Sequence, residues 1–129
     1  FVDATLEEVR PDDHIWIQDV HFTLMPAALR EELPENDIAL FWHIPFPPWE
    51  TFSCIPWRKE ILEGMLGADL LGFHTAPYVA NFLGAVKKEF PEAQVSTSAA
   101  PASRVIRTAS GQISREDHEG EGVPHRDRL

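Results

Sequence analysis

Three polar side chains stand where short apolar runs of the chain end. Asp19 and His74 each follow such a run directly, and His43 is the last residue of another. An aspartate can accept hydrogen bonds from hydroxyl groups, and a histidine can donate or accept one with a charge that changes near neutral pH. Side chains of these types could therefore bind a ligand that carries hydroxyl groups.

Each of the three residues also has a purely structural interpretation. An aspartate after a strand often caps the turn or helix that comes next. A histidine at a strand end can simply satisfy backbone groups, and this interpretation is stronger for His74 than for His43. A metal site is a third alternative, because one aspartate and two histidines can bind a first-row metal. The chain has no H-E-x-x-H motif and no close histidine pair, which argues against the metal.

The elements that position these residues alternate between strands and helices. Short apolar runs predict the strands, and apolar residues at helical spacing predict the helices. The predicted strands are 14–18, 37–43 and 69–73, and the predicted helices lie within 25–33, 56–67 and 78–90. The spacing allows helical crossovers, so we expect a parallel sheet with right-handed connections, a Rossmann-like α/β fold. In such a sheet the ligand crevice lies outside the carboxyl ends of the strands, where Asp19, His43 and His74 stand.

Burial and helix ends can also be predicted at three places. The run at 38–42 is apolar without alternation, which is typical of a strand covered on both faces. Gly67 stands at the end of the second helix, where a glycine commonly caps it. Cys54 lies among large apolar residues, so we expect a buried structural thiol rather than a nucleophile.

The segment after His43 is a stiff, apolar loop. It reads FWHIPFPPWETF from residue 41 to residue 52, and its three prolines fix the backbone φ angle. Such a loop could hold a ligand-facing side chain in place, or it could only route the chain around a helix end.

Composition and charge exclude several classes of function. The formal net charge is −10, which argues against nucleic acid as a partner and does not favour an acidic membrane surface. No apolar run approaches the length of a membrane span. A single cysteine excludes an internal disulfide and fits a reducing compartment, so we expect a cytoplasmic protein.

The aromatic residues are unevenly distributed along the chain. All of them lie before residue 91, and the residues after it are rich in Ser, Ala, Arg, Glu, Gly and Pro. Such a composition buries little apolar surface. We therefore predict a folded part over 1–90 and a poorly ordered or divergent tail over 91–129.

Four motifs together carry a family resemblance. They are WIQDVHF (16–22), FWHIPFPPWETF (41–52), IPWRKEIL (55–62) and GADLLGFHT (67–75). In order and spacing the chain resembles trehalose-6-phosphate synthases, the retaining glycosyltransferases of family 20. The resemblance covers about residues 5–90. It implies that they are part of the N-terminal Rossmann-like domain of a two-domain GT-B glycosyltransferase.

The resemblance implies a role for each strand-end residue. Asp19 matches the family aspartate that holds hydroxyls of the acceptor, glucose 6-phosphate. His43, in an intact H-I-P-F-P motif, matches the histidine that contacts the glucose of the nucleotide-sugar donor. His74 lies in an intact G-F-H-T motif and is given a supporting role. The first motif reads Q-D-V-H-F from Gln18 where the family pattern is H-D-Y-H-L, which leaves the acceptor's identity open.

The implied reaction transfers glucose from UDP-glucose, or another nucleoside-diphosphate glucose, to glucose 6-phosphate with retention at the anomeric carbon. The family's favoured mechanism is a front-face reaction in which the leaving phosphate helps to deprotonate the attacking hydroxyl. The protein contributes orientation and charge stabilisation. No metal and no other cofactor is implied.

The resemblance also implies missing parts and leaves alternatives open. The C-terminal GT-B domain and most groups that hold the phosphates lie outside the match, so we expect residues 1–129 alone to be inactive. A glucosylglycerol-phosphate synthase, with glycerol 3-phosphate as acceptor, is the alternative within the enzyme class. A non-catalytic α/β module that binds a partner is the alternative outside it. Self-association into a homo-oligomer stays open.

Overall fold

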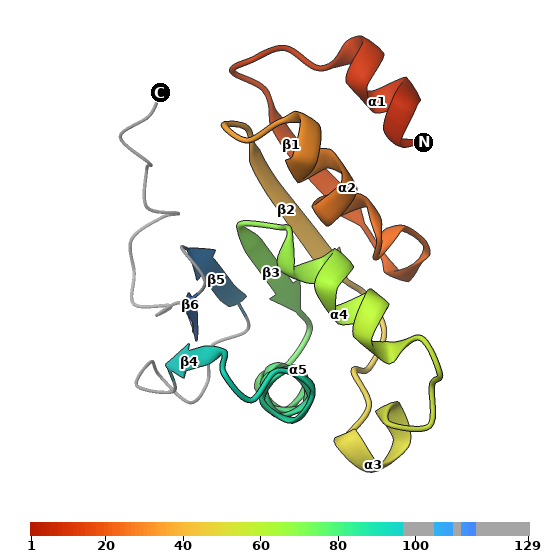
Figure 1. The fold of residues 1–129 in the computed structure, drawn as a ribbon, viewed down its shortest axis with the longest axis vertical. Helices are drawn as coiled ribbons and strands as arrows, with labels where there is room; N and C mark the ends of the chain where they lie inside the picture. The colour runs from red at the N-terminus through yellow and green to blue at the C-terminus, as the bar shows by residue number, and fades with distance from the viewer. Residues whose placement is uncertain (97–104, 110–111, 116–129) are drawn as a thin grey trace.

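The computed structural model describes residues 1–96, 105–109 and 112–115. Its strands form one six-stranded sheet in the order β1-β2-β3-β5-β6-β4 (Figure 1). The strands are β1 His14–Gln18, β2 Asp37–Trp42, β3 Leu70–Phe73, β4 Gln94–Ser96, β5 Val105–Ala109 and β6 Gln112–Arg115. The helices are α1 Val2–Glu8, the short 3-10 helix η1 Val20–Phe22, α2 Met25–Glu32, α3 Trp49–Phe52, α4 Arg58–Leu66 and α5 Ala76–Glu89.

The three strands predicted from the sequence lie side by side in the sheet and are parallel to one another. β1 pairs with β2 and β2 pairs with β3, both in parallel register. The connection from β1 to β2 contains α2, and the connection from β2 to β3 contains α4, as the spacing required. The prediction of an α/β fold with Rossmann-like parallel strands is therefore confirmed.

One face of the parallel strands carries most of the core. In β2, Ile38, Leu40 and Trp42 are buried, whereas the residues between them are half-buried. Figure 1 shows α2 and α4 lying side by side over the parallel strands, and the two helices are in contact. On β1 the side chain of Trp16 is 70% exposed. The prediction that 38–42 is covered on both faces therefore holds fully for one face only, because the other face is half-buried, and the uniform apolar sequence does not show this difference.

Helices α2 and α4 approach each other closely because glycines stand at the contact. A Cβ atom at Gly64 would lie 2.4 Å from the carbonyl oxygen of Thr23, and one at Gly67 would lie 2.3 Å from the backbone of Ala27. Gly67 does occupy the C-cap of α4, as predicted, but with φ −69° and not in the left-handed conformation. A glycine is therefore required at position 67 by the close packing of the two helices and not by the geometry of the cap.

An arginine joins the amino ends of β2 and β3 to helix α2. The Arg30 guanidinium donates to Asp69 Oδ2 at 2.6 Å and to the carbonyl oxygen of Asn36 at 2.8 Å. The same Asp69 oxygen accepts from the backbone N–H of Ile38 at 2.9 Å. This network fixes the edge of the sheet opposite to the one at which Asp19, His43 and His74 stand.

The structure describes part of the chain after residue 90. It describes β4, β5 and β6 there, and β5 extends the sheet by pairing antiparallel with β3. Ile106 on β5 is fully buried. Aromatic content misses this strand because its apolar residues, Val105 and Ile106, are β-branched rather than aromatic. Residues 97–104, 110–111 and 116–129 lie outside the described residues, and the division into 1–90 and 91–129 stays a prediction.

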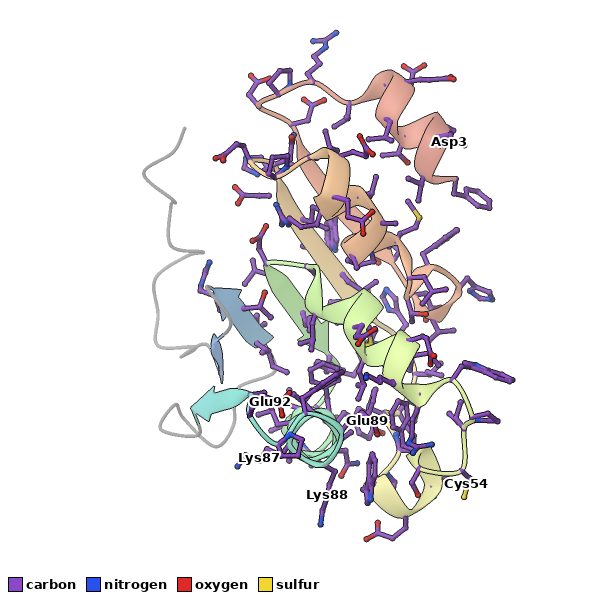
Figure 2. The ribbon with its side chains drawn as sticks, in the orientation of Figure 1. Asp3, Cys54, Lys87, Lys88, Glu89 and Glu92 are labelled. Atoms are coloured by element: carbon purple, nitrogen blue, oxygen red, sulfur yellow. The ribbon has the colours of Figure 1, made fainter. Side chains whose placement is uncertain are left out.

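The one cysteine of the chain lies on the surface. Cys54 is exposed on the loop after α3, where Figure 2 labels it, so the prediction of a buried thiol is wrong. Its Sγ lies 3.5 Å from the carbonyl oxygen of Glu50, within the short turn that α3 forms. Within the described part of the chain, no helix has the length and apolar character needed to cross a membrane.

Candidate functional site

The structure places the three predicted site residues at one edge of the parallel sheet. β1, β2 and β3 end at Gln18, Trp42 and Phe73, and the next residue in each case is Asp19, His43 or His74. The parallel registers of the three strands align these carboxyl ends. The imidazole rings of His43 and His74 lie with their centroids 5.4 Å apart. Asp19 is joined to the same edge because its backbone N–H donates to the carbonyl oxygen of Phe41 at 2.8 Å.

Asp19 has an unusual backbone conformation. Its φ is 74° and its ψ is 175°, and no other non-glycine residue in the described part of the chain has a positive φ. This region of conformational space is strained for a residue with a Cβ atom, at a cost on the order of 1–3 kcal/mol. Asp19 Oδ1 accepts from the backbone N–H of Val20 at 2.8 Å and so caps η1. The capping interpretation of Asp19 is therefore correct for one of its two carboxylate oxygens.

His43 is exposed to solvent and held from two sides. Its Nε2 lies 2.6 Å from Oε1 of Gln18, the last residue of the neighbouring strand. Its ring lies 4.6 Å from the ring of Phe41, measured between centroids. The ring of Phe41 is also 5.2 Å from that of His74, at 73°, so it contacts both histidines. Gln18 and Phe41 were not among the predicted site residues.

A glycine on β3 makes room for the Phe41 ring. A Cβ atom at Gly72 would lie 2.6 Å from Cδ2 and 3.0 Å from Cε2 of Phe41. Phe41 and Gly72 are directly paired across β2 and β3. Because Gly72 has no side chain, the Phe41 ring can lie across the neighbouring strand and form the floor beneath His43 and His74. The G-F-H-T motif contained this glycine, but its role depends on the strand register.

The proline loop after His43 is anchored by an aromatic side chain. Phe46 is 1% exposed and packs against Trp42, Phe52, Phe73 and Phe82. Its carbonyl oxygen accepts from Nδ2 of Asn81 on α5 at 2.8 Å. The prolines limit the backbone, whereas Phe46 and the Asn81 amide fix where the loop lies. The sequence predicted a stiff loop but did not identify Asn81.

The helix after His74 begins with a well-formed cap. Thr75 is the N-cap of α5, and its Oγ1 accepts from the backbone N–H of Tyr78 at 3.4 Å. Pro77 lies in the first turn of the helix, where it costs no hydrogen bond. The cap fixes where α5 starts and therefore where the exposed His74 leaves the strand.

Within the described residues, neither basic hydrogen-bond donors nor a group of metal ligands is found at this edge of the sheet. In the described residues, no arginine or lysine hydrogen-bonds to Asp19, His43 or His74, and no group of three or more His, Cys, Asp and Glu side chains could hold a metal ion. The metal alternative therefore has no matching arrangement in this part of the chain. Arg58 donates to Glu89 at 3.0 Å and lies over the ring of Trp49. Figure 2 labels Glu89, the last residue of α5, together with the exposed Lys87 and Lys88.

A Rossmann-like sheet with polar side chains along the carboxyl ends of its strands is typical of α/β proteins that bind a ligand at that edge. The model of glycosyltransferase family 20 matches residues 1–115. The chain belongs to this family. The family resemblance drawn from the motifs is thereby confirmed, and the match extends beyond residues 5–90 at both ends.

Curated relatives are trehalose-phosphate synthases. The chain is 44% identical over 93 residues to the UDP-forming alpha,alpha-trehalose-phosphate synthase of Pichia angusta, covering 68% of this chain and 20% of the relative. It is 40% identical over 113 residues to the trehalose-6-phosphate synthase of Mycolicibacterium smegmatis, covering 88% of this chain and 22% of the relative. The chain thus spans about a fifth of the length of these relatives.

Solved structures agree on the fold. The N-terminal domain of Candida albicans trehalose-6-phosphate phosphatase matches with a TM-score of 0.76 at 31% identity, over 88% of this chain and 23% of the other. An alpha,alpha-trehalose-phosphate synthase from Burkholderia xenovorans, in complex with glucose-6-phosphate, matches with a TM-score of 0.73 at 31% identity, over 88% and 24%. The predicted fold, part of the N-terminal domain of a GT-B glycosyltransferase, is confirmed.

Proposed function

We propose that this chain is part of a retaining glucosyltransferase that makes alpha,alpha-trehalose 6-phosphate. The donor is UDP-glucose or another nucleoside-diphosphate glucose, and the acceptor is glucose 6-phosphate. The proposal is supported by relatives that are named trehalose-phosphate synthases. Two similar structures also support it, one in complex with glucose-6-phosphate and one from E. coli described as bound with UDP-2-fluoro glucose.

The observation that carries the proposal is the conformation of Asp19. A strained backbone persists only where the surrounding structure enforces it, and such strain is concentrated at functional sites. A cap alone does not require it, because Ser, Thr or Asn in an ordinary extended conformation caps a helix equally well. Since Oδ1 is occupied by the Val20 N–H, Oδ2 is the oxygen that we assign to a hydroxyl of the acceptor sugar.

The remaining roles are assigned from the positions of the two histidines. The exposed ring of His43 contacts the glucose of the donor and orients it above the edge of the sheet. His74 lies beside it and supports its position. Asp19, on the next strand, holds the acceptor so that its attacking hydroxyl and the donor's anomeric carbon meet. Orientation of two bound substrates is a large part of the rate enhancement that such a site provides.

In the proposed reaction the bond between the anomeric carbon and the donor's phosphate oxygen breaks. A new bond forms from the same face to the acceptor's hydroxyl oxygen, and the hydroxyl proton passes to the departing phosphate. The products are the nucleoside diphosphate and the disaccharide phosphate. No side chain becomes covalently attached to the sugar, because the Asp19 carboxylate is assigned to the acceptor's hydroxyl and not to the anomeric carbon.

The described part of the chain offers few groups at the site that could hold phosphates. Phosphoryl groups are held by arginine, lysine or helix N-termini. The two arginines with described ion pairs, Arg30 and Arg58, are bound to Asp69 and Glu89 rather than placed at the site. We therefore propose that the phosphates are held largely by residues outside this chain, including a C-terminal GT-B domain.

The single, exposed cysteine supports a cytoplasmic location.

The test is an Asp19→Asn substitution in the natural polypeptide that contains these residues. Asparagine keeps the shape of the side chain and can still accept from Val20, but it loses the charge. We expect kcat/KM to fall by about 10²-fold or more, as for the loss of a charged group that orients or stabilises the reacting atoms. Release of the nucleoside diphosphate, with nucleotide-glucose and glucose 6-phosphate as substrates, is the measurement.

Asp12→Asn is the matched control, because Asp12 is exposed and lies before β1 at the other end of the strand. It should leave turnover unchanged. The unfolding midpoint of each variant reports whether the fold is kept. If Asp19→Asn turns over like Asp12→Asn, the proposed role of Asp19 is wrong.

A non-catalytic α/β module is the second candidate, and one comparison favours it. A similar structure is the N-terminal domain of a protein named for phosphatase activity, so this fold occurs in proteins with a different named function. In a module of that kind, Asp19→Asn would change only folding stability. Glucosylglycerol-phosphate synthesis is separated from trehalose-phosphate synthesis by identifying the product when glycerol 3-phosphate competes with glucose 6-phosphate.

A further inference from the structure

The side chain of Gln18 contacts His43, and the proposed function gives Gln18 no role. Gln18 is the last residue of β1, and its register partner is Phe41 on β2. His43 lies two residues beyond Phe41, so by the alternation of a strand it is on the same side of the sheet. Gln18 Oε1 thereby reaches His43 Nε2 across the two strands, at 2.6 Å.

The chemistry of this contact determines where the His43 proton lies. In the orientation that the structure gives to the Gln18 amide, its oxygen faces His43 and can only accept, so the facing Nε2 donates and carries the hydrogen. A neutral imidazole has one protonated nitrogen, and its other nitrogen is then an acceptor. Of the two neutral tautomers, the contact therefore fits the one with hydrogen on Nε2 and a lone pair on Nδ1.

We propose that Gln18 is a positioning residue that holds His43 in the Nε2–H tautomer and presents Nδ1 as a hydrogen-bond acceptor to the ligand. This proposal rests on the proposed function, in which the ligand group is a hydroxyl of the donor sugar. That hydroxyl can donate a hydrogen bond to Nδ1. The proposal adds a residue that acts on the donor only through His43.

Two further contacts restrict the ring without choosing its tautomer. The Phe41 ring lies against one side of His43 and the His74 ring lies beside it. These ring contacts limit how the imidazole can turn, but neither a phenyl face nor a tilted ring contact distinguishes Nε2 from Nδ1. In the described part of the chain, Gln18 makes the hydrogen bond that does so.

A glutamine suits this role because it does not titrate. The family pattern has histidine at this position, and a histidine can either donate or accept, depending on its own protonation. Gln18 offers its oxygen regardless of pH. Its amide can still turn and offer its NH₂ group, which would reverse the tautomer of His43, so the direction of the hydrogen bond is a measurable property.

The test uses ¹⁵N NMR of histidine-labelled protein in its full natural length. Long-range ¹H–¹⁵N correlations identify which imidazole nitrogen carries the hydrogen, and His43→Asn identifies the His43 signal by its loss. We expect the Nε2–H form in the wild-type protein. Gln18→Glu keeps an acceptor of the same length and should keep this form, whereas Gln18→Leu should give a mixture of tautomers.

Gln18→Asn is the matched control for reach. It keeps the amide but is shorter by one methylene group, so it should behave like Gln18→Leu rather than like the wild type. Gln18 is exposed, and the unfolding midpoints of the variants should therefore stay close to that of the wild type. A wild-type Nδ1–H signal, or an Nε2–H signal that Gln18→Leu leaves unchanged, would overturn the proposal.

Kinetics separate this proposal from the proposed function. In Gln18→Leu the KM for the nucleotide-glucose should rise roughly five- to tenfold, as for one lost neutral hydrogen bond, while the KM for the acceptor stays constant. An equal change in both KM values would contradict the assignment to the donor. A protein without transferase activity, in which Gln18→Leu still changes the tautomer, would contradict the proposed function and support the positioning role of Gln18.

Discussion

The backbone at Asp19 and the missing side chain at Gly72 both decide where the polar groups of the site lie. Asp19 bends the chain sharply after β1, and Gly72 leaves space for the Phe41 ring beneath the histidines. The strand-end positions of Asp19, His43 and His74 could be predicted, because apolar runs mark where strands end. The φ angle of Asp19 and the Gln18–His43 hydrogen bond could not, because they depend on side chains that meet across two strands.

Gly72→Ala tests the role of the Phe41 ring. The added Cβ would lie 2.6 Å from Phe41 Cδ2, so the ring must move, and the two histidines that rest on it must shift. We expect kcat/KM to fall by at least about tenfold, because small displacements of orienting groups are costly. The stability cost should be about 1–3 kcal/mol, as for other overpacked sites.

Gly84→Ala is the control for this substitution, because a Cβ at Gly84 on α5 meets nothing within 4 Å. It should leave turnover unchanged and stabilise the fold by about 0.5–1 kcal/mol, since alanine is the better helix former. Steady-state kinetics and urea unfolding of both variants give the comparison. Wild-type kinetics in Gly72→Ala would show that the Phe41 ring does not position the histidines.

At the scale of elements, the parallel strands were predictable and the added antiparallel strand was not. β1, β2 and β3 are short apolar runs separated by helices, so local sequence identifies them. The residues of β5 that pair with β3 lie more than thirty residues away from it along the chain. A pairing over this distance leaves no periodic pattern in the local sequence. The β-branched Val105 and Ile106 of β5 were a local indication of a strand, but no local feature specifies its partner.

Ile106→Ala tests whether β5 is part of the folded unit. Ile106 is fully buried, so its truncation should lower the free energy of unfolding by about 2–4 kcal/mol. Leu24→Ala is the control, because Leu24 is 58% exposed and should change the stability little. Urea unfolding of both variants is the measurement. An Ile106→Ala variant as stable as Leu24→Ala would favour a folded unit that ends near residue 90.

At the scale of the whole molecule, the chain carries its candidate site residues at the carboxyl ends of parallel strands and has an excess of acidic residues. Its formal net charge is −10, and the phosphates of both proposed substrates are also negative. Acidic groups alone would repel them, so we expect cations from outside this chain to help to hold the substrates. Composition could indicate this deficit, whereas the position of the missing groups could not be predicted from a chain that spans about a fifth of its relatives.

The most direct measurement compares product formation by the full natural polypeptide and by residues 1–129, with nucleoside-diphosphate glucose and glucose 6-phosphate as substrates. We predict that the full polypeptide releases one nucleoside diphosphate for each alpha,alpha-linked disaccharide phosphate, and that residues 1–129 form none. A full polypeptide that is folded and forms no such product with any nucleoside-diphosphate glucose, or measurable turnover by residues 1–129 alone, would contradict this prediction.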